Sequence, residues 1–305
     1  MKADSRFTAM PANFWSYVRL ISQDVGYSGR GVVTVPTVAQ SISALRERGL
    51  ESCEIHDGQA VTAFGSTLMD YFRYRADVLN DYVQPRLRDA EEARRSFDAL
   101  YSTLDPGCPI PMNKQKGAMR APAYLTGIVN MLMEEAVDGS PCDYDPRELI
   151  VATRGGLPLR TLSRRVDGAF PGAIDPLAVW EIKEYYYTTT FGSRVADGVY
   201  ESLLDGMEIE DLEAASGQRI EHVLIVDSRF TWWECGKSYL CRLIDMLNMR
   251  YVDHILFGRE VEEMLPDLAR GWRSQYEAGQ QRLLLAAEEP GEYADSAQTH
   301  ASRTS

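Results

Sequence analysis

The sequence predicts an α/β protein in which a helical amino-terminal third precedes a sheet-forming remainder. Two strongly apolar runs, at residues 177–183 and 222–227, are expected to be buried strands because apolar side chains occupy both of their faces. Helical apolar spacing precedes, separates and follows these two runs, whereas the first third of the chain shows mainly helical patterns. Strands that alternate with helices are typical of an α/β sheet.

The amino-terminal third, residues 1–110, is expected to form a helical domain. Its predicted elements are a helix at 13–23, a Gly-rich turn at 26–31, a helix at 37–48, a strand at 52–56 and helices at 61–80 and 85–100, followed by a linker at 104–111. Short helices, a turn and a strand resemble a winged-helix DNA-binding module. A plain helical scaffold or a dimerisation domain fits the same pattern.

The second domain is expected at residues 111–270, and residues 271–305 are expected to hold a helix end and a disordered acidic tail. The predicted elements are a helix at 123–137, a strand at 148–153, one strand carrying Asp167 and another carrying Glu181, a helix at 191–204, a strand at 222–227, a helix at 237–249 and a short apolar run at 254–257.

Charged side chains stand at the end of the apolar 177–183 strand. Alternation places Glu181 and Lys183 on one face, where burial is costly unless they meet each other, a metal or a ligand. The Pro- and Gly-rich segment 170–176 predicts a chain reversal centred near residue 174, which places Asp167 opposite Glu181. Asp175 is the rival carboxylate, but six residues of extended strand separate it from Glu181 by roughly 20 Å. We therefore expect Asp167, Glu181 and Lys183 to converge, with Asp175 in the turn.

Asp167 followed by Glu181-Ile182-Lys183 resembles the active-site signature of the PD-(D/E)XK nuclease superfamily, which includes type II restriction endonucleases. The order helix, three strands, helix, strand over residues 121–258 is similar to the core of that superfamily, a mixed central sheet flanked by helices. One departure is Val166, which stands where the family often has proline.

The resemblance implies a Mg²⁺ ion held by Asp167, Glu181 and the backbone carbonyl of Ile182, with Lys183 as a catalytic side chain. It also implies a further acidic residue on the first core helix, for which Glu135, at the edge of the apolar helix stripe, is the candidate; a solvated surface carboxylate is the alternative. Oxygen ligands of this kind suit Mg²⁺.

The implied activity is hydrolysis of double-stranded DNA by a restriction-type or phage-defence endonuclease. A homodimer is expected because cutting both strands normally takes two sites, and a cognate methyltransferase or another defence protein is an expected partner. Two alternatives fit the same residues. One is a catalytically inactive nucleic-acid-binding protein of this fold, and the other is an α/β interaction protein whose Glu181 and Lys183 form a structural ion pair.

The formal net charge of −13 does not exclude a DNA partner, because phosphate contact depends on local charge. The acids are dense at 201–213 and in the tail, away from two basic stretches that flank the proposed site in sequence. The candidate DNA-contacting side chains are Lys114, Lys116, Arg120, Arg160, Arg164, Arg165 and Arg194.

The cysteines and the hydropathy pattern bear on location. Five cysteines, an odd number without a CxxC pair, indicate reduced thiols and a cytoplasmic protein. No run of about 18 apolar residues predicts a membrane span.

Overall fold

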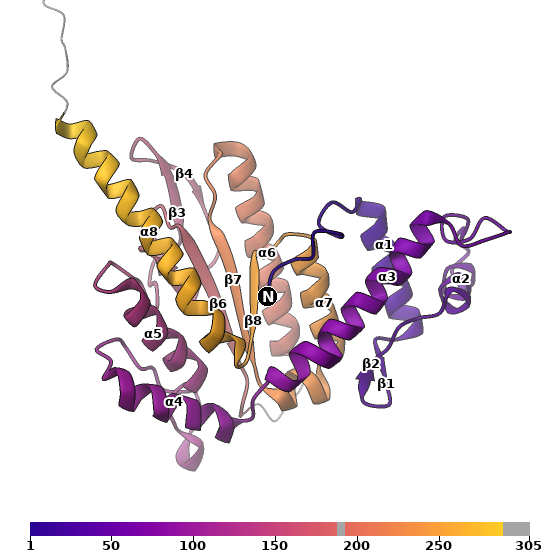
Figure 1. The fold of residues 1–305 in the computed structure, drawn as a ribbon, viewed down its shortest axis with the longest axis horizontal. Helices are drawn as coiled ribbons and strands as arrows, with labels where there is room; N and C mark the ends of the chain where they lie inside the picture. Colours follow the sequence, from indigo (N-terminus) through magenta and orange to yellow (C-terminus); the bar gives the residue numbers. More distant parts are fainter. Residues whose placement is uncertain (188–192, 289–305) are drawn as a thin grey trace, which may run out of the picture.

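The computed structural model describes residues 1–187 and 193–288, apart from the side chains of residues 118, 193, 194 and 283–288. It is an α/β protein with a mixed sheet flanked by helices, as the sequence predicts (Figure 1). The described helices are α1 (Ala12–Val25), α2 (Val38–Glu47), α3 (Ala63–Asp77), α4 (Ala90–Leu104), α5 (Tyr124–Val137), α6 (Ser193–Ser216), α7 (Lys237–Asn248) and α8 (Glu260–Glu288), with short helical turns η1 (Val78–Val83), η2 (Gln84–Arg86), η3 (Gly117–Met119) and η4 (Arg229–Cys235). The described strands are β1 (Ser28–Gly29), β2 (Val32–Val33), β3 (Val151–Arg154), β4 (Leu157–Thr161), β5 (Gly168–Phe170), β6 (Ala178–Glu184), β7 (Glu221–Asp227) and β8 (His254–Phe257).

The central sheet has the strand order β5-β6-β7-β8. β5 and β6 form an antiparallel hairpin, whereas β6, β7 and β8 run parallel to one another. The chain passes from β6 to β7 through α6 and from β7 to β8 through α7, since parallel neighbours need crossover connections. The carboxyl ends of three strands therefore meet at one edge of the sheet.

Helices cover both faces of this sheet. On one face, Trp180, Ile225 and Leu256 pack with the apolar side chains of α5 and α8, and α4 packs against α5 (Figure 1). On the other face, Leu224 and Phe257 pack with α7 and the start of α6. Because both faces are buried, β6, β7 and β8 are apolar on both sides.

A separate hairpin of β3 and β4 stands beside the central sheet. The expected strand at 148–153 is observed at Val151–Arg154, and its partner β4 was not predicted. Gly155 and Gly156 make the tight reversal possible, since both have positive φ angles of 60° and 78°. The hairpin packs apolar side chains such as Ala152 against the far half of α6.

The amino-terminal helices α1 and α3 pack around an aromatic core that includes Phe14 and Tyr71. A buried ion pair of 3.0 Å between Arg75 of α3 and Asp245 of α7 joins this portion to the sheet. The expected strand at 52–56 is wrong, because the segment forms turns with a single bridge from His56 to Val61. The only other described hairpin here, β1–β2, lies between α1 and α2.

Two helix boundaries differ from the expected ones. The helix expected from Pro85 begins at Ala90, because Asp89 caps it through a capping box with Glu92. The helix expected to end at residue 204 continues through Gly206 to Ser216, since that glycine lets α6 lie against the backbone of the 251 region.

Candidate functional site

The candidate site lies in the carboxyl-terminal half of β6. Alternation along this strand puts Val179, Glu181 and Lys183 on the face toward α6, while Trp180 and Ile182 face α5 and α8. Glu181 is 1 % exposed and Lys183 is 6 % exposed. Two ionisable side chains are therefore buried on one face, two residues apart.

Asp167 immediately precedes β5. The register pairs Gly168 with Trp180 across the hairpin, as the turn residues predict, and the N–H of Asp167 donates a hydrogen bond of 3.1 Å to the carbonyl of Trp180, so Asp167 lies against the Trp180–Ile182 segment of β6. The Asp167 carboxylate accepts a hydrogen bond of 2.7 Å from the backbone N–H of Ile182. Gly168 is required at this point, because a Cβ atom there would lie 2.0 Å from the ring of Trp180.

Glu181 is paired at both of its oxygens. Lys183 Nζ lies 2.8 Å from Oε2, and Arg164 Nη1 lies 2.8 Å from Oε1. Burial alone would raise the pKa of Glu181, but the charges of Lys183 and Arg164 outweigh it and hold that pKa below its ordinary value. Glu181 is therefore a carboxylate fixed between two cations.

Two further carboxylates come from α6 and were not among the predicted site residues. Asp205 Oδ2 lies 2.6 Å from Arg164 Nη1, and Glu201 Oε2 lies 3.2 Å from Lys183 Nζ and 3.3 Å from Arg164 Nη2. We placed both acids in a segment away from the site; the structure corrects this, because the crossover helix lies over the face that carries Glu181. Their i, i+4 spacing, directly after the strand with the motif, was the available signal.

The cluster carries excess negative charge. Among the described side chains, it contains the carboxylates of Asp167, Glu181, Glu201 and Asp205 and two cationic groups, Arg164 and Lys183. Burial raises the pKa of Asp205 to about 7, because the opposing charge of Arg164 offsets it only in part. Surrounding protein atoms and the charge of Glu181 raise the pKa of Asp167 to about 6, although Asp167 itself remains open to solvent. Such a site favours added positive charge.

The structure does not bring Asp175 or Glu135 into this cluster. Asp175 has a positive φ of 51° in the turn before β6, and its carboxylate accepts hydrogen bonds from the N–H and hydroxyl of Thr153. Glu135 is exposed in the last turn of α5, a helix that covers the opposite face of the sheet.

The predicted basic side chains lie around the site in different settings. Arg164 is inside the cluster, Arg160 pairs with Asp211 at 3.2 Å, and Arg165 is exposed. The side chain of Arg194 lies outside the described residues.

The basic loop that carries exposed Lys114, Lys116 and Arg120 leads into α5. The start of α5 meets the end of β6, because Glu184 accepts a hydrogen bond of 3.1 Å from the N–H of Thr126. This contact places the start of α5, into which the loop leads, at the end of the strand that carries Glu181 and Lys183.

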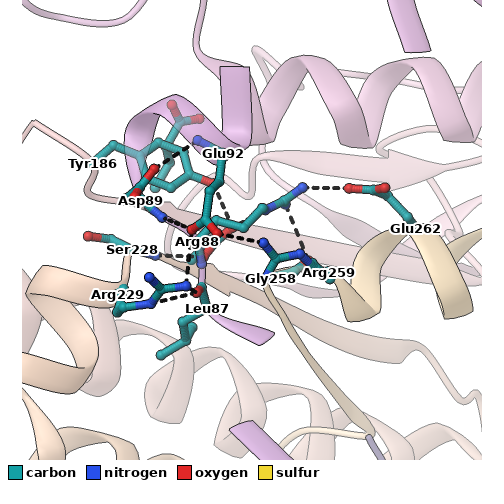
Figure 2. Close-up of polar contacts among 12 residues, drawn as sticks. Leu87, Arg88, Asp89, Glu92, Tyr186, Ser228, Arg229, Gly258, Arg259 and Glu262 are labelled. Atoms are coloured by element: carbon teal, nitrogen blue, oxygen red, sulfur yellow. Dashed lines mark hydrogen bonds and ion pairs between the residues drawn. The ribbon is translucent and has the colours of Figure 1, made fainter. Parts of the chain in front are cut away.

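A second charged network, absent from our sequence predictions, lies at the carboxyl edge of the sheet (Figure 2). Asp227, at the end of β7, accepts hydrogen bonds from Arg88 Nε at 2.7 Å and from the hydroxyl of Tyr186 at 2.6 Å. Arg88 also contacts Glu262 of α8 at 2.5 Å. Arg88 and Asp227 are both completely buried, so the network fixes the chain just after Lys183.

The donor set around Asp167 suits a hard cation. In a strand, N–H and C=O of one residue point to the same side, so the carbonyl of Ile182 points toward Asp167, which precedes the first residue of β5. Carboxylate and carbonyl oxygens are ligands that Mg²⁺ accepts. Among the described residues, no group of three or more His, Cys, Asp or Glu side chains is already arranged as a metal site.

Within the same residues, no helix is both long and apolar enough to cross a membrane.

Two family models match the chain. A model described as Domain of unknown function (DUF7690) matches residues 1–82, and a model described as Domain of unknown function (DUF7687) matches residues 88–272. No curated protein and no solved structure matches the chain. The second match includes Arg164, Asp167, Glu181, Lys183 and both α6 carboxylates, and it covers more than half of the sequence. The chain therefore belongs to the DUF7687 family.

Proposed function

We propose that the protein is a metal-dependent endonuclease that hydrolyses phosphodiester bonds of double-stranded DNA with a PD-(D/E)XK-type site. The observation that carries this proposal is the β5–β6 hairpin, in which Asp167 is hydrogen-bonded to Trp180 and Ile182 on either side of Glu181, while Lys183 pairs with Glu181. Asp167 is open to solvent at this position, so a substrate phosphate has access to it.

The order of elements supports a restriction-endonuclease-like core. Helix α5 precedes the β5–β6 hairpin, and α6 then crosses over to the parallel strand β7. The first strand of such a core would be the segment before β5. Within the described residues, its only backbone bridge to a strand of the central sheet joins Asp143 to Ala169, while Ile150 and Val166 pack in one cluster with Val179 of β6. The β3 strand pairs with β4 instead, so this core has an irregular edge.

Each residue of the site has a defined task in this proposal. Asp167, Glu181 and the carbonyl of Ile182 would hold Mg²⁺, which, when bound, activates a water molecule and neutralises charge on the phosphoryl group. Lys183, held by Glu181, orients the attacking water and stabilises the negative charge that develops on phosphate.

The expected partners follow from the surroundings of the site. The exposed loop with Lys114, Lys116 and Arg120, together with Arg160 and Arg165, would follow the DNA backbone, because lysine and arginine provide the phosphate contacts that give affinity. The amino-terminal helices with the β1–β2 hairpin would form a winged-helix DNA-binding module. We further propose a cytoplasmic homodimer that works with a cognate methyltransferase or another phage-defence protein.

The test is cleavage of plasmid and phage DNA, modified and unmodified, with Mg²⁺ or with EDTA. We expect Mg²⁺-dependent cuts that disappear in Lys183→Ala. Lys2→Ala is the matched control, because it removes one lysine charge from an exposed position at the start of the chain. Circular dichroism and thermal unfolding must show that both variants are folded. Cleavage that persists in Lys183→Ala would contradict the proposal.

One observation favours a second candidate, a nucleic-acid-binding protein of this fold without catalysis. Arg164 and Lys183 occupy both oxygens of Glu181, so the ion pairs alone account for its burial. Salt-dependent binding to duplex DNA, without cleavage under any divalent cation, would support this candidate over the nuclease. No binding to nucleic acid at all would leave an α/β interaction protein with a structural Glu–Lys pair.

A further inference from the structure

Arg164 occupies a position that resembles that of a bound cation. Its Nη1 atom alone lies 2.8 Å from Glu181 Oε1 and 2.6 Å from Asp205 Oδ2, and Nη2 lies 3.3 Å from Glu201 Oε2. One nitrogen therefore bridges two carboxylates that come from different elements, β6 and α6. Bridging carboxylates on separate elements is also the common way in which proteins hold a divalent cation.

Asp205 shows that Arg164 does not satisfy the carboxylates completely. Its side chain is fully buried, and its Oδ1 atom has no hydrogen-bond partner within the described part of the chain. Glu181, the other bridged acid, is also buried. A buried carboxylate oxygen without a partner is costly, and a cation with more than one open coordination position would remove that cost.

The two acids that Arg164 bridges belong to regular elements, whereas the ion pairs of the Arg164 side chain, among the described residues, are all with acids of this cluster. Glu181 belongs to the central strand β6 and Asp205 to the middle of α6, so both backbones are part of regular elements. Arg164 belongs to the stretch between β4 and β5, which has no helix or strand, and a quarter of its side chain is exposed. Arg164 can therefore leave the carboxylates without disturbing the sheet.

We propose that Glu181, Glu201 and Asp205 form a second cation position, filled by the guanidinium of Arg164 in the metal-free protein and by Mg²⁺ or Mn²⁺ after Arg164 withdraws. The inference rests on the proposed function, because it takes Asp167 and Glu181 as the first metal position. It also gives the released Arg164 a partner. A guanidinium freed at the mouth of the site is suited to two-point contact with a DNA phosphate.

The experiment is a titration of the full-length protein with Mn²⁺, followed by calorimetry and by the electron paramagnetic resonance signal of free Mn²⁺. Wild type is expected to bind one Mn²⁺ tightly and a second one weakly. Arg164→Gln should bind the second ion at least tenfold more tightly, because its competitor is gone. Asp205→Asn should lose the second ion and keep the first.

The matched controls are Arg165→Gln and Glu210→Gln, which change charge by the same amount at exposed neighbouring positions. Both should bind Mn²⁺ as wild type does. Because Arg164→Gln leaves buried Asp205 without its ion pair and Glu181 with Lys183 alone, the stability of the variant is measured as well, and Mn²⁺ should raise its melting temperature by more than it raises that of wild type.

Three results would overturn the inference. The first is equal stoichiometry and affinity in wild type and Arg164→Gln. If the single ion is then lost in Asp167→Asn, the proposed nuclease site survives and only the second position fails. The second is an equal gain of affinity in the Arg165→Gln control, which would show a general charge effect. The third is absence of Mn²⁺ binding in both wild type and Arg164→Gln, which would remove the inference and the proposed metal-dependent function together.

Discussion

Replacing Arg88 with methionine should destabilise the protein strongly, because it breaks a completely buried ion pair. Asp227 would keep its contacts with the N–H groups of Ser228 and residue 88 and with the hydroxyl of Tyr186, but it would lose the guanidinium contact at 2.7 Å. Glu262 would lose its contact as well. Removing one partner of a buried pair typically costs about 3 to 5 kcal/mol. At roughly 2 to 4 °C per kcal/mol, the melting temperature should fall by about 6 to 20 °C.

The assay is urea unfolding followed by tryptophan fluorescence, with Arg95→Met as the control. Arg95 is 64 % exposed in α4 and reaches Glu91 only at 3.8 Å, so its replacement should change the free energy of unfolding by less than about 0.5 kcal/mol. Adding Asp227→Asn to Arg88→Met should restore part of the stability, because no buried charge then remains unpaired. A loss below about 1 kcal/mol for Arg88→Met, or no recovery in the double variant, would refute this reasoning.

Two further predictions test the hairpin and the histidine at the start of β8. Gly168→Ala should lower the free energy of unfolding by roughly 1 to 3 kcal/mol, because the added Cβ would overlap the buried ring of Trp180. Gly172→Ala in the same hairpin is the control, since a Cβ there has open space. Equal melting temperatures of the two variants would contradict this packing. Burial lowers the pKa of His254 to about 4, below the ordinary 6.5. Between these two pH values the unfolded chain binds a proton that the folded protein does not, so the stability that neutral His254 provides is fully present above pH 6.5 and is lost as the pH falls toward 4. Between pH 7.5 and 4.5, the free energy of unfolding of wild type, measured in urea, should therefore fall by about 2 to 3 kcal/mol more than that of His254→Gln. Equal losses in the two proteins would contradict a lowered pKa of His254.

The sequence was informative where a pattern is local. The apolar runs predicted β6, β7 and β8, and the Pro- and Gly-rich turn predicted the register of the β5–β6 hairpin, which brings Asp167 against the strand that carries Glu181. The sequence pattern was less informative where packing decides. Residues 52–56 carry a strand-like pattern, yet they form turns. Ile55 is buried, and its backbone lies so close to Gly65 of α3 that a Cβ atom on Gly65 would lie 2.3 Å from the carbonyl oxygen of Ile55.

The composition of the site could be predicted only in part, for a physical reason. Asp167 and Glu181 share one hairpin, so counting residues from the turn was enough to align them. Glu201 and Asp205 reach the same site through a crossover helix, and only the tertiary fold defines which face of that helix meets the strand. Their acidic segment was therefore placed away from the site, although two of its members lie against Arg164.

The end of β6 is held on three sides, which bears on what the site can do. Lys183 is tied to Glu201 of α6, Glu184 to Thr126 at the start of α5, and Tyr186 to Asp227 of β7. These anchors lie on both faces of the sheet and at its edge, so the strand cannot shift without breaking at least one of them. Rigid support of this kind is what a site needs if its charges are to act on a phosphate without first rearranging. Arg164 lies on no helix or strand, which is why our proposal makes it the charged group that moves when a cation or a phosphate arrives.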